Sequence, residues 1–378
     1  MKNYWQEVKL GDICEYSRNR ISISEVNLCN YVSTENLLKE RAGKTIADSI
    51  PEQANLCEYN KGCTLISNIR PYFKKIWFAN TRGGCSNDVL VYKPNNGIND
   101  KWLYYLLSQD SFFNFVMSGT KGTKMPRGDK SQIMKFPVAL PPLDEQKKIA
   151  GVLSALDDKI ELNNKINRNL EAQAQAIFKS WFIDFEPFKN GKFIDSELGK
   201  IPEGWSIGTI GDISIISTGK RPDKKSVNKS NETPIPIIGA SSIMGYTNKA
   251  LYNDKILITG RVGTHGIIQK IDSPCWPSDN TLILRSKNLN FLHNCLLLIN
   301  WKSMNRGSTQ PLITQNDLKN TRIILPQDKI IQNYEQLVHY FDIKFHNNNK
   351  EIYALSQICD LLLPKLMSGE VNISDYIA

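Results

Sequence analysis

The residues of this chain best suited to chemistry are basic side chains that stand beside glycines and aromatic residues in loop-like segments. In the first half they occur in Arg70-Pro-Tyr-Phe-Lys-Lys75 and Lys121-Gly-Thr-Lys-Met-Pro-Arg-Gly-Asp-Lys130. In the second half they occur in Lys220-Arg-Pro-Asp-Lys-Lys225, Gly260-Arg-Val-Gly-Thr-His265 and Asn305-Arg-Gly-Ser-Thr-Gln310. Arg and Lys bind phosphates or the guanine edge, and Asn and Gln suit adenine, so these segments indicate contact with DNA.

The candidate DNA-contacting side chains are the charged and amide residues of these loops. They are Arg70, Lys74, Lys121, Lys124, Arg127, Lys220, Arg221, Arg261, His265, Arg306 and Gln310. Any single run could instead be a solvated surface loop, and we prefer that interpretation for Lys224 and Lys225.

No catalytic constellation is recognisable. Gly43-Lys44-Thr45 resembles the end of a P-loop, but Leu38 stands where the first glycine is required. The chain has no Gly-x-Gly-x-x-Gly and no Asn-Pro-Pro-Tyr or Asp-Pro-Pro-Tyr motif of an amino-methyltransferase. Asp157-x-Lys159 and Asp342-x-Lys344 resemble the tail of a nuclease motif, but both fall in helical segments, and we interpret them as ordinary solvated charges.

The composition is that of a soluble, basic, two-domain protein. A length of 378 residues suits two domains, and 47 basic against 38 acidic residues favour a polyanionic partner, although a merely basic protein is the alternative. The eight cysteines form no Cys-x-x-Cys pair, and His339 and His346 lie seven apart, so we expect no metal site and no disulfide framework. Without a signal peptide or an apolar run of roughly 20 residues, a cytoplasmic location is expected.

The elements that must position these loops are written twice. Residues 122–165 and 307–350 align without a gap at an offset of 185. Gly122, Pro126, Leu140, Pro141, Asp157, Lys159, Asn163, Asn164 and Lys165 recur as Gly307, Pro311, Leu325, Pro326, Asp342, Lys344, Asn348, Asn349 and Lys350. Upstream, Trp5 recurs as Trp205 and Gly11-Asp-Ile13 as Gly211-Asp-Ile213.

Both copies have the same order of predicted elements. Short β-type runs at 63–67, 75–79 and 88–92 are followed by an apolar helix near 101–108, and runs at 255–259 and 280–284 precede one near 291–299. The offset decreases along the chain, so the second copy is shorter by loop deletions. The loops 121–127 and 306–312 occupy the same position in the repeat but differ in sequence. This predicts that each domain recognises a different short DNA sequence.

Each copy ends in a long helix with a heptad seam. The first seam is Ile149, Leu153, Leu156, Ile160, Asn163, Asn167, Leu170, Ala174, Ile177 and Trp181, and the second is Tyr334, Val338, Phe341, Phe345, Asn348, Ile352, Leu355, Cys359, Leu362 and Leu366. We expect the two seams to pack on each other, antiparallel, in a rod of roughly 55 Å. Asn163 and Asn348 either fix the register as buried amides or face solvent at the seam edge.

Several motifs resemble one known family. Leu140-Pro-Pro-Leu-Asp-Glu-Gln146, Leu153-Ser-Ala-Leu-Asp-Asp-Lys-Ile160 and Phe178-Lys-Ser-Trp-Phe-Ile-Asp-Phe-Glu-Pro-Phe188 resemble the central region of type I restriction–modification specificity subunits. Gly199-Lys-Ile-Pro-Glu-Gly-Trp205 resembles the opening of the second target-recognition domain, and Leu362-Leu-Pro-Lys-Leu-Met-Ser-Gly-Glu370 the C-terminal signature. The second copy departs at Leu325-Pro-Gln-Asp-Lys-Ile330, so the start of its helix stays open.

The resemblance implies an α+β fold in which two homologous target-recognition domains, with mixed short-strand sheets and small helices, are separated by two long antiparallel helices. The implied segments are domain one at 1–143, a central helix at 144–185, a linker at 186–204, domain two at 205–326, a second helix at 327–368 and a tail at 369–378. The coiled-coil and partner-docking candidates are Leu153, Leu156, Ile160, Asn163, Leu170, Val338, Phe341, Phe345, Asn348 and Leu355.

The resemblance also implies a non-catalytic subunit without a cofactor that reads a bipartite double-stranded DNA site, one half per domain. Its partners would be two modification subunits, which bind S-adenosylmethionine and methylate adenine, and two restriction subunits, which act as motor-nucleases. The alternatives are a specificity chain of a related type II system, an interaction scaffold that binds no DNA, and an enzyme with an unrecognised site.

Overall fold

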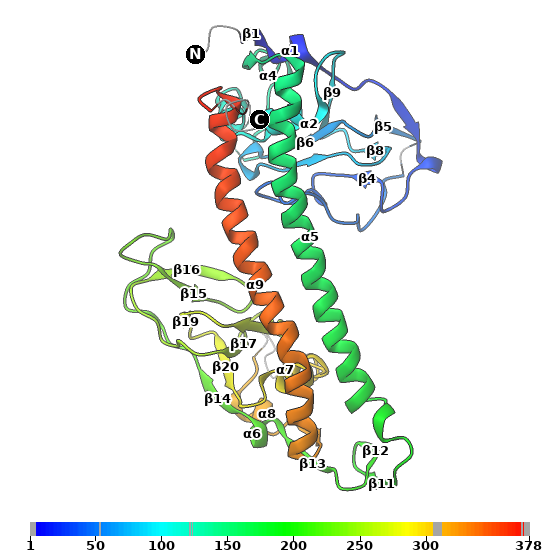
Figure 1. The fold of residues 1–378 in the computed structure, drawn as a ribbon, viewed down its shortest axis with the longest axis vertical. Helices are drawn as coiled ribbons and strands as arrows, with labels where there is room; N and C mark the ends of the chain where they lie inside the picture. Colours follow the sequence, from blue (N-terminus) through cyan, green and yellow to red (C-terminus); the bar gives the residue numbers. More distant parts are fainter. Residues whose placement is uncertain are drawn as a thin grey trace. The chain divides into compact units, whose positions relative to one another are not determined.

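A computed structural model describes residues 5–52, 54–120, 122, 124–304, 312–371 and 373. The chain forms two compact units, one of residues 1–164 and 349–378 and the other of residues 165–348. Each unit holds one globular domain and half of each of two 40-residue helices, α5 (Leu143–Phe182) and α9 (Asp328–Met367), which Figure 1 draws as unbroken ribbons. Gly307 and Pro311 of the repeat, and the candidates Lys121, Arg306 and Gln310, lie outside the described residues.

The first domain is built from two four-stranded sheets and a strand pair. One sheet has the order β2 (Cys14–Tyr16), β9 (Val89–Pro94), β6 (Thr64–Ser67), β7 (Ile76–Phe78), and the other the order β3 (Arg20–Ser22), β5 (Asn55–Tyr59), β8 (Gly83–Cys85), β4 (Tyr31–Val32). β1 (Gln6–Lys9) pairs with β10 (Pro137–Leu140). The short helices are α1 (Leu10–Ile13), α2 (Asp100–Ser108), α3 (Asp110–Ser118), α4 (Lys130–Ile133), and the 3-10 turns η1 (Ile23–Glu25) and η2 (Pro71–Phe73).

The second domain repeats the first of these sheets with the same strand order. That sheet runs β14 (Ile215–Thr218), β20 (Thr281–Arg285), β17 (Ile256–Gly260), β18 (Gln269–Ile271), and a three-stranded sheet runs β16 (Ile243–Thr247), β15 (Ile235–Ile238), β19 (Trp276–Pro277). β13 (Ser206–Thr209) pairs with β21 (Arg322–Leu325), and β11 (Phe193–Ser196) pairs with β12 (Gly199–Pro202) within the segment 186–204. The helices are α6 (Ile210–Ile213), α7 (Leu289–Leu297), α8 (Gln315–Lys319) and the turn η3 (Glu186–Phe188).

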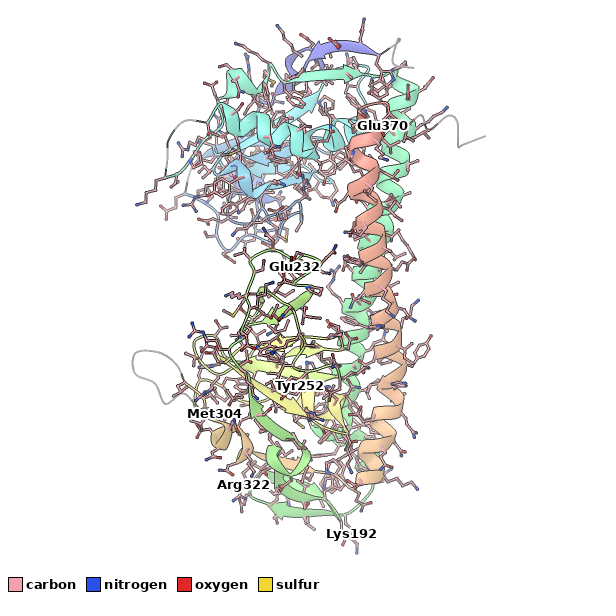
Figure 2. The ribbon with its side chains drawn as sticks, turned by 90° about the vertical axis from the view of Figure 1, so that its left-hand side faces the viewer. Lys192, Glu232, Tyr252, Met304, Arg322 and Glu370 are labelled. Carbon is pink, nitrogen blue, oxygen red and sulfur yellow. The ribbon has the colours of Figure 1, made fainter. Side chains whose placement is uncertain are left out.

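Local sequence explains these elements. β6 and β17 are short apolar runs whose residues are all buried, as expected for the central strands of a covered sheet. The Asn99 side chain accepts a hydrogen bond from the Trp102 backbone N–H at 2.9 Å and so starts α2. Figure 2 places Tyr252 against the strands of the second domain, where its hydroxyl lies 3.1 Å from Ser217 Oγ. The predicted strands are confirmed as β6, β7, β9, β17 and β20, and the two apolar helices as α2 and α7.

The long helices run antiparallel within each unit. In the first unit, Ile149 and Leu153 of α5 share a core with Leu362 and Leu366 of α9, and α5 meets α9 again where Lys159 pairs with Glu351 at 3.4 Å. In the second unit, the C-terminal part of α5 packs on the N-terminal part of α9 in one core. All twenty predicted seam positions are buried or half-buried, so the predicted heptad register is confirmed.

The seam contains two buried amide contacts. Asn163 is 1% exposed and its Nδ2 donates to Glu351 Oε2 at 2.9 Å in the first unit. Asn348 is 2% exposed and its Nδ2 donates to Asn167 Oδ1 at 2.8 Å in the second. The alternative of a solvent-facing asparagine at the seam edge is therefore wrong for both residues. A buried polar contact of this kind would be lost if one helix shifted along the other, which favours a role in fixing register.

Within the described residues, neither the two 40-residue helices nor any shorter one has the length and apolar character of a membrane-spanning helix.

Candidate nucleic-acid interface

Three segments converge in the first domain: the turn 68–75 after β6, the turn 86–88 before β9, and the loop that precedes α4. The Asn68 backbone N–H donates to Asp88 O at 2.8 Å, and the Gly128 N–H donates to Asn68 O at 3.3 Å. Ile69 and Arg127 form an isolated antiparallel bridge. Two basic segments that lie far apart in sequence are therefore neighbours.

The second domain makes the same three contacts with its own residues. The Arg261 N–H donates to Asn280 O at 2.8 Å, and the Ile313 N–H donates to Arg261 O at 3.0 Å. Val262 and Leu312 form the matching isolated bridge. The two candidate surfaces thus occupy equivalent places in the two domains, as the repeat predicts.

Glycines permit this close approach. A Cβ on Gly128 would lie 2.8 Å from Asn68 Oδ1 and 2.9 Å from the side chains of Ile133 and Val116. A Cβ on Gly260 would lie 1.9 Å from Thr264 O, which belongs to the backbone of the turn itself. A larger residue at position 260 must therefore displace the turn, and one at position 128 must displace the side chains of Asn68, Ile133 and Val116.

The candidate cations of the first domain differ in how they are engaged. Arg70 and Lys74 flank η2 with positive φ values of 51° and 49°. The Lys74 ammonium lies 2.9 Å from Asp110 Oδ1, and this contact, with Arg41, lowers the pKa of Asp110. Lys74 is therefore partly neutralised by α3. Arg127 pairs with Asp88 at 3.1 Å, while Lys124 is exposed.

The candidates of the second domain surround the turn 278–280 before β20. The Lys220 N–H donates to Pro277 O at 3.0 Å, and Trp276 Nε1 donates to Lys220 O at 2.7 Å, which leaves the Lys220 and Arg221 side chains exposed. His265 Nδ1 lies 3.2 Å from Gly260 O, so that ring is fixed against β17. The structure thus brings Lys220 to the same turn that Arg261 contacts.

Unpaired buried polar atoms gather at these segments. In the described part of the chain, ten buried side-chain N or O atoms lack a hydrogen-bond partner, and six of them belong here. They are Asn68 Oδ1, Arg70 Nε, Ser86 Oγ, Thr259 Oγ1, His265 Nε2 and Ser278 Oγ. Because proteins rarely leave such groups unpaired, each is a position where a ligand or water is expected to bond.

Sequence reasoning missed Ser86 and Ser278, although a signal was present. Each stands two residues before Asp88 or Asn280, which open matched strands of the repeat. The Ser86 N–H donates to Val32 O and the Ser278 N–H to Ile238 O, both at 2.9 Å, so the two serines are structural counterparts.

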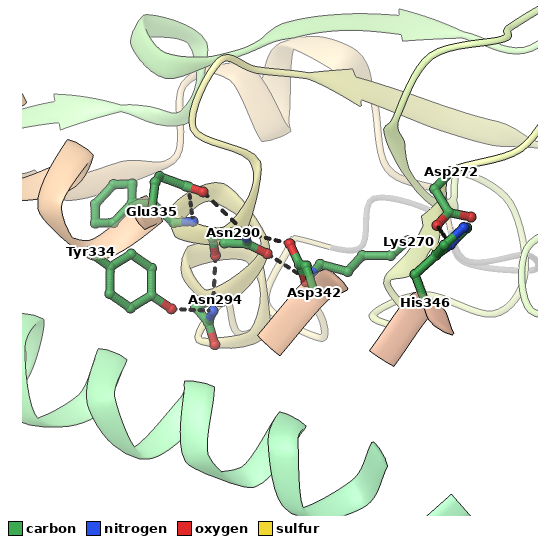
Figure 3. Close-up of polar contacts among 9 residues, drawn as sticks. Lys270, Asp272, Asn290, Asn294, Tyr334, Glu335, Asp342 and His346 are labelled. Carbon is green, nitrogen blue, oxygen red and sulfur yellow. Dashed lines mark hydrogen bonds and ion pairs between the residues drawn. The ribbon is translucent and has the colours of Figure 1, made fainter. Parts of the chain in front are cut away.

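Half-buried carboxylates attach the long helices to the domains. The Tyr105 hydroxyl donates to Asp157 Oδ2 at 2.7 Å in the first unit. In the second unit, Figure 3 shows Asp342 between Asn290 and Lys270, with Asn290 Nδ2 donating to Oδ2 at 2.7 Å and the Lys270 ammonium 3.1 Å from Oδ1. The interpretation of Asp157 and Asp342 as solvated charges is therefore wrong. Their partners come from segments of the same unit that lie far away in sequence, so the helical pattern did not reveal them.

A second long-helix side chain meets the start of each small helix. Gln146 Oε1 accepts from the Asn99 N–H at 2.9 Å, and Glu335 Oε1 accepts from the Phe291 N–H at 2.8 Å. Burial raises the pKa of Glu335, although its amide donors oppose the shift. Acceptors at helix N-termini satisfy N–H groups that have no partner inside the helix.

The docking candidates lie in the helix seam, with Leu153, Asn163, Val338 and Asn348 buried. Leu156, Ile160, Leu170, Phe341, Phe345 and Leu355 are half-buried. The apolar side chains that α9 exposes are others: Leu337, Tyr340, Ile343, Tyr353, Ile358 and Leu361. Among the described residues, no group of three or more His, Cys, Asp or Glu could hold a metal ion.

Comparisons with known proteins point to one family. The model of the type I restriction modification DNA specificity domain matches residues 2–172 and again residues 202–357. The type I restriction enzyme MjaIX specificity subunit of Methanocaldococcus jannaschii is 29% identical, over 93% of this chain and 87% of the relative. The HindI specificity subunit of Haemophilus influenzae is 24% identical, over 97% and 99%. A crystal structure of a type I S subunit from M. genitalium has the same fold, with a TM-score of 0.57 and 16% identity over 96% of both chains.

Proposed function

We propose that each of the two domains reads one half of a bipartite DNA site, because this chain belongs to the type I restriction–modification DNA specificity family. The chain is a non-catalytic DNA specificity subunit, and catalysis resides in partner subunits. The family match favours neither a type II chain nor a scaffold that binds no DNA. The observation that carries the proposal is the matched convergence of three segments in both domains.

In the first domain, the surface around Asn68 and Ser86 recognises one half-site of the DNA. Arg70, Lys124 and Arg127 stand at this surface, and Lys121 belongs to the same loop outside the described residues. Exposed cations contact phosphates and set the position of the duplex, and the unpaired polar atoms of this surface, which are buried, would have to become accessible before they bond base edges. Lys74, already paired with Asp110, contributes mainly positive potential.

In the second domain, the surface around Thr259 and Ser278 recognises the other half-site. Arg261 and His265 belong to the turn after β17, and Lys220 and Arg221 to the strand end beside it. Arg306 and Gln310, which we propose as further contacts to this half-site, lie outside the described residues. The two surfaces have the same backbone contacts but different side chains, as expected if equivalent domains recognise two different DNA sequences.

The helices then serve as spacer and docking surface. We propose the segment limits 1–143, 144–185, 186–204, 205–326, 327–368 and 369–378. Two modification subunits and two restriction subunits would dock on the helix pair, where the exposed apolar side chains of α9 offer contact area. We expect this assembly in the cytoplasm.

The test is to exchange one loop and read both half-sites. Residues 122–130 are replaced by a Gly/Ser loop of equal length, the chain is expressed with its modification subunit, and methylated adenines are mapped across a genome. Specificity should relax in one half-site only, and replacing 305–312 should relax the other. Degradation of both half-sites by either exchange contradicts the proposal. Binding should also weaken steeply as salt rises, because phosphate contacts release counterions.

A further inference from the structure

Cys57 and Cys85 face each other across two antiparallel strands of the first domain. They are register partners in the β5–β8 pair, so their side chains lie on one face of the sheet. Directly opposed residues have Cα atoms roughly 4.5–5.5 Å apart, which falls within the roughly 4.4–6.8 Å that a disulfide spans. Cys85 is fully buried in an apolar cluster, and Cys57 is half-buried at its edge. Both are free thiols in the structure.

The surroundings of Cys57 favour its thiolate. A hydrogen bond from the Cys85 thiol is the largest of the causes that lower the pKa of Cys57, to about 7, and Arg20 and Lys130 act in the same direction. Arg20 is the register partner of Cys57 on the opposite strand, β3. Burial and Glu58 oppose the shift. Because the thiolate is the nucleophile, Cys57 is the reactive member and Cys85 the buried one.

We propose that Cys57 and Cys85 form a redox pair that hydrogen peroxide oxidises to a cross-strand disulfide. The Cys57 thiolate attacks one peroxide oxygen, the O–O bond breaks, and the departing hydroxide takes up a proton to give water, which leaves Cys57 as a sulfenic acid. The Cys85 sulfur then attacks the Cys57 sulfur, and the thiol proton leaves with the displaced hydroxide as a second water. Two thiols lose two electrons and one peroxide gains them. Two equivalents of a small thiol reverse the reaction.

The pair lies directly before the candidate DNA surface of the first domain. Cys85 precedes Ser86, and the same turn ends at Asp88, which pairs with Arg127 and accepts the Asn68 N–H. A disulfide would therefore tie β5 to the strand that leads into this turn. This consequence rests on the proposed function, whereas the chemistry of the pair does not.

The second domain offers an internal control. Pro277 precedes Ser278 as Cys85 precedes Ser86, and both serines make the same backbone bond at 2.9 Å. A proline cannot form a disulfide, so oxidation should act on the first half-site alone.

The test treats the full chain with hydrogen peroxide, alkylates the remaining thiols and maps cysteines by mass spectrometry. Two of the eight cysteines should escape alkylation and appear in one peptide linked through Cys57 and Cys85, and dithiothreitol should restore both. Cys57→Ser and Cys85→Ser should each abolish the link, while Cys29→Ser, at an exposed cysteine, should leave it unchanged. The rate should rise as pH increases through about 7. A link to Cys63, or oxidised Cys57 beside a free Cys85, overturns the pair.

The functional arm measures binding to duplex DNA that carries either half-site, before and after oxidation. Oxidised protein should lose roughly tenfold affinity for the first half-site and none for the second, the size expected when one base contact is disturbed. A complete disulfide that leaves the first half-site unaffected refutes the link to DNA reading. If the reduced protein binds neither half-site, the proposed function fails, while the peptide map still decides whether the pair exists.

Discussion

Replacing Tyr105 with Phe tests how the first domain is held on α5. The substitution removes only the hydroxyl that donates to Asp157 Oδ2 at 2.7 Å, and the ring, in a side chain that is 7% exposed, keeps its packing. Hydrogen bonds to charged acceptors contribute about 1.5–3 kcal/mol, so Tyr105→Phe should lower the free energy of unfolding by about that amount at pH 7. In an Asp157→Asn background the same change should cost only about 0.5–1.5 kcal/mol, since the acceptor is neutral.

The pH dependence of this effect has a definite sign. Burial raises the pKa of Asp157, and the Tyr105 hydrogen bond partly opposes it. The native carboxyl therefore holds its proton to higher pH than the unfolded one, and its contribution to stability is greatest below the ordinary Asp pKa and decreases as pH rises through the raised value. Removing the hydroxyl raises that pKa further. Tyr105→Phe should thus cost more at pH 7 than near pH 4, and Asp157→Asn should remove this difference.

The assay combines urea unfolding with hydrogen exchange. The unfolding free energy is compared at constant m-value, and exchange is followed in the peptide 100–118, which covers α2 and α3 and should exchange faster in Tyr105→Phe. Tyr340→Phe, at a 68% exposed position on α9, is the matched control and should change stability by less than about 0.5 kcal/mol. Equal costs of Tyr105→Phe with and without the Asp157 carboxylate would show that this bond does not hold the domain.

Three further predictions concern the helix pair and the candidate surfaces. Asn167→Leu or Asn348→Leu alone should lower the free energy of unfolding by about 1–3 kcal/mol, while the double variant should recover most of it in urea titrations, and additive losses would contradict a direct pairing. Gly128→Ala should weaken binding roughly tenfold on the first half-site only, because its Cβ collides with the Asn68 side chain, and Gly260→Ala on the second only, because its Cβ collides with the backbone of its own turn. A loss on both half-sites from one change would be inconsistent with separate readers. Glu335→Ala should destabilise α7 by about 1.5–3 kcal/mol and Glu335→Gln by less, as read by hydrogen exchange in 289–297, and equal losses would exclude an acceptor role.

The sequence predicted well whatever depends on periodicity. The 3.5-residue spacing that begins at Ile149 placed every seam residue correctly, because a heptad leaves one face of a helix to bury. The repeat aligns without a gap at the loops before α4 and α8, and residues 305–311 of the second loop lie outside the described residues. The sequence left open whether Asn163 and Asn348 are buried or face solvent. Both are buried, and the sequence did not predict their partners, Glu351 for Asn163 and Asn167 for Asn348.

The sequence could not predict contacts that form only between distant segments. Asp157 has the spacing of a solvated helical charge, and only the packing of α2 reveals Tyr105 above it. Gln146 and Glu335 both accept a hydrogen bond at the start of a small helix, although they do not occupy matching positions in the repeat. Ser86 looks like an ordinary turn residue until the burial of its hydroxyl without a partner in the described structure becomes visible.

The discontinuity of the first unit bears on the order in which the protein is made. Its core joins Leu10 and Leu103 to Leu366, Met367 and Ile373, whereas the second unit is one uninterrupted stretch of chain. During synthesis the second domain can therefore complete its core while the first, although translated earlier, still exposes apolar surface. Synthesis of the second half of α9 would then complete the core of the first domain. A chain truncated directly after residue 348 should therefore misfold in its first domain and not in its second.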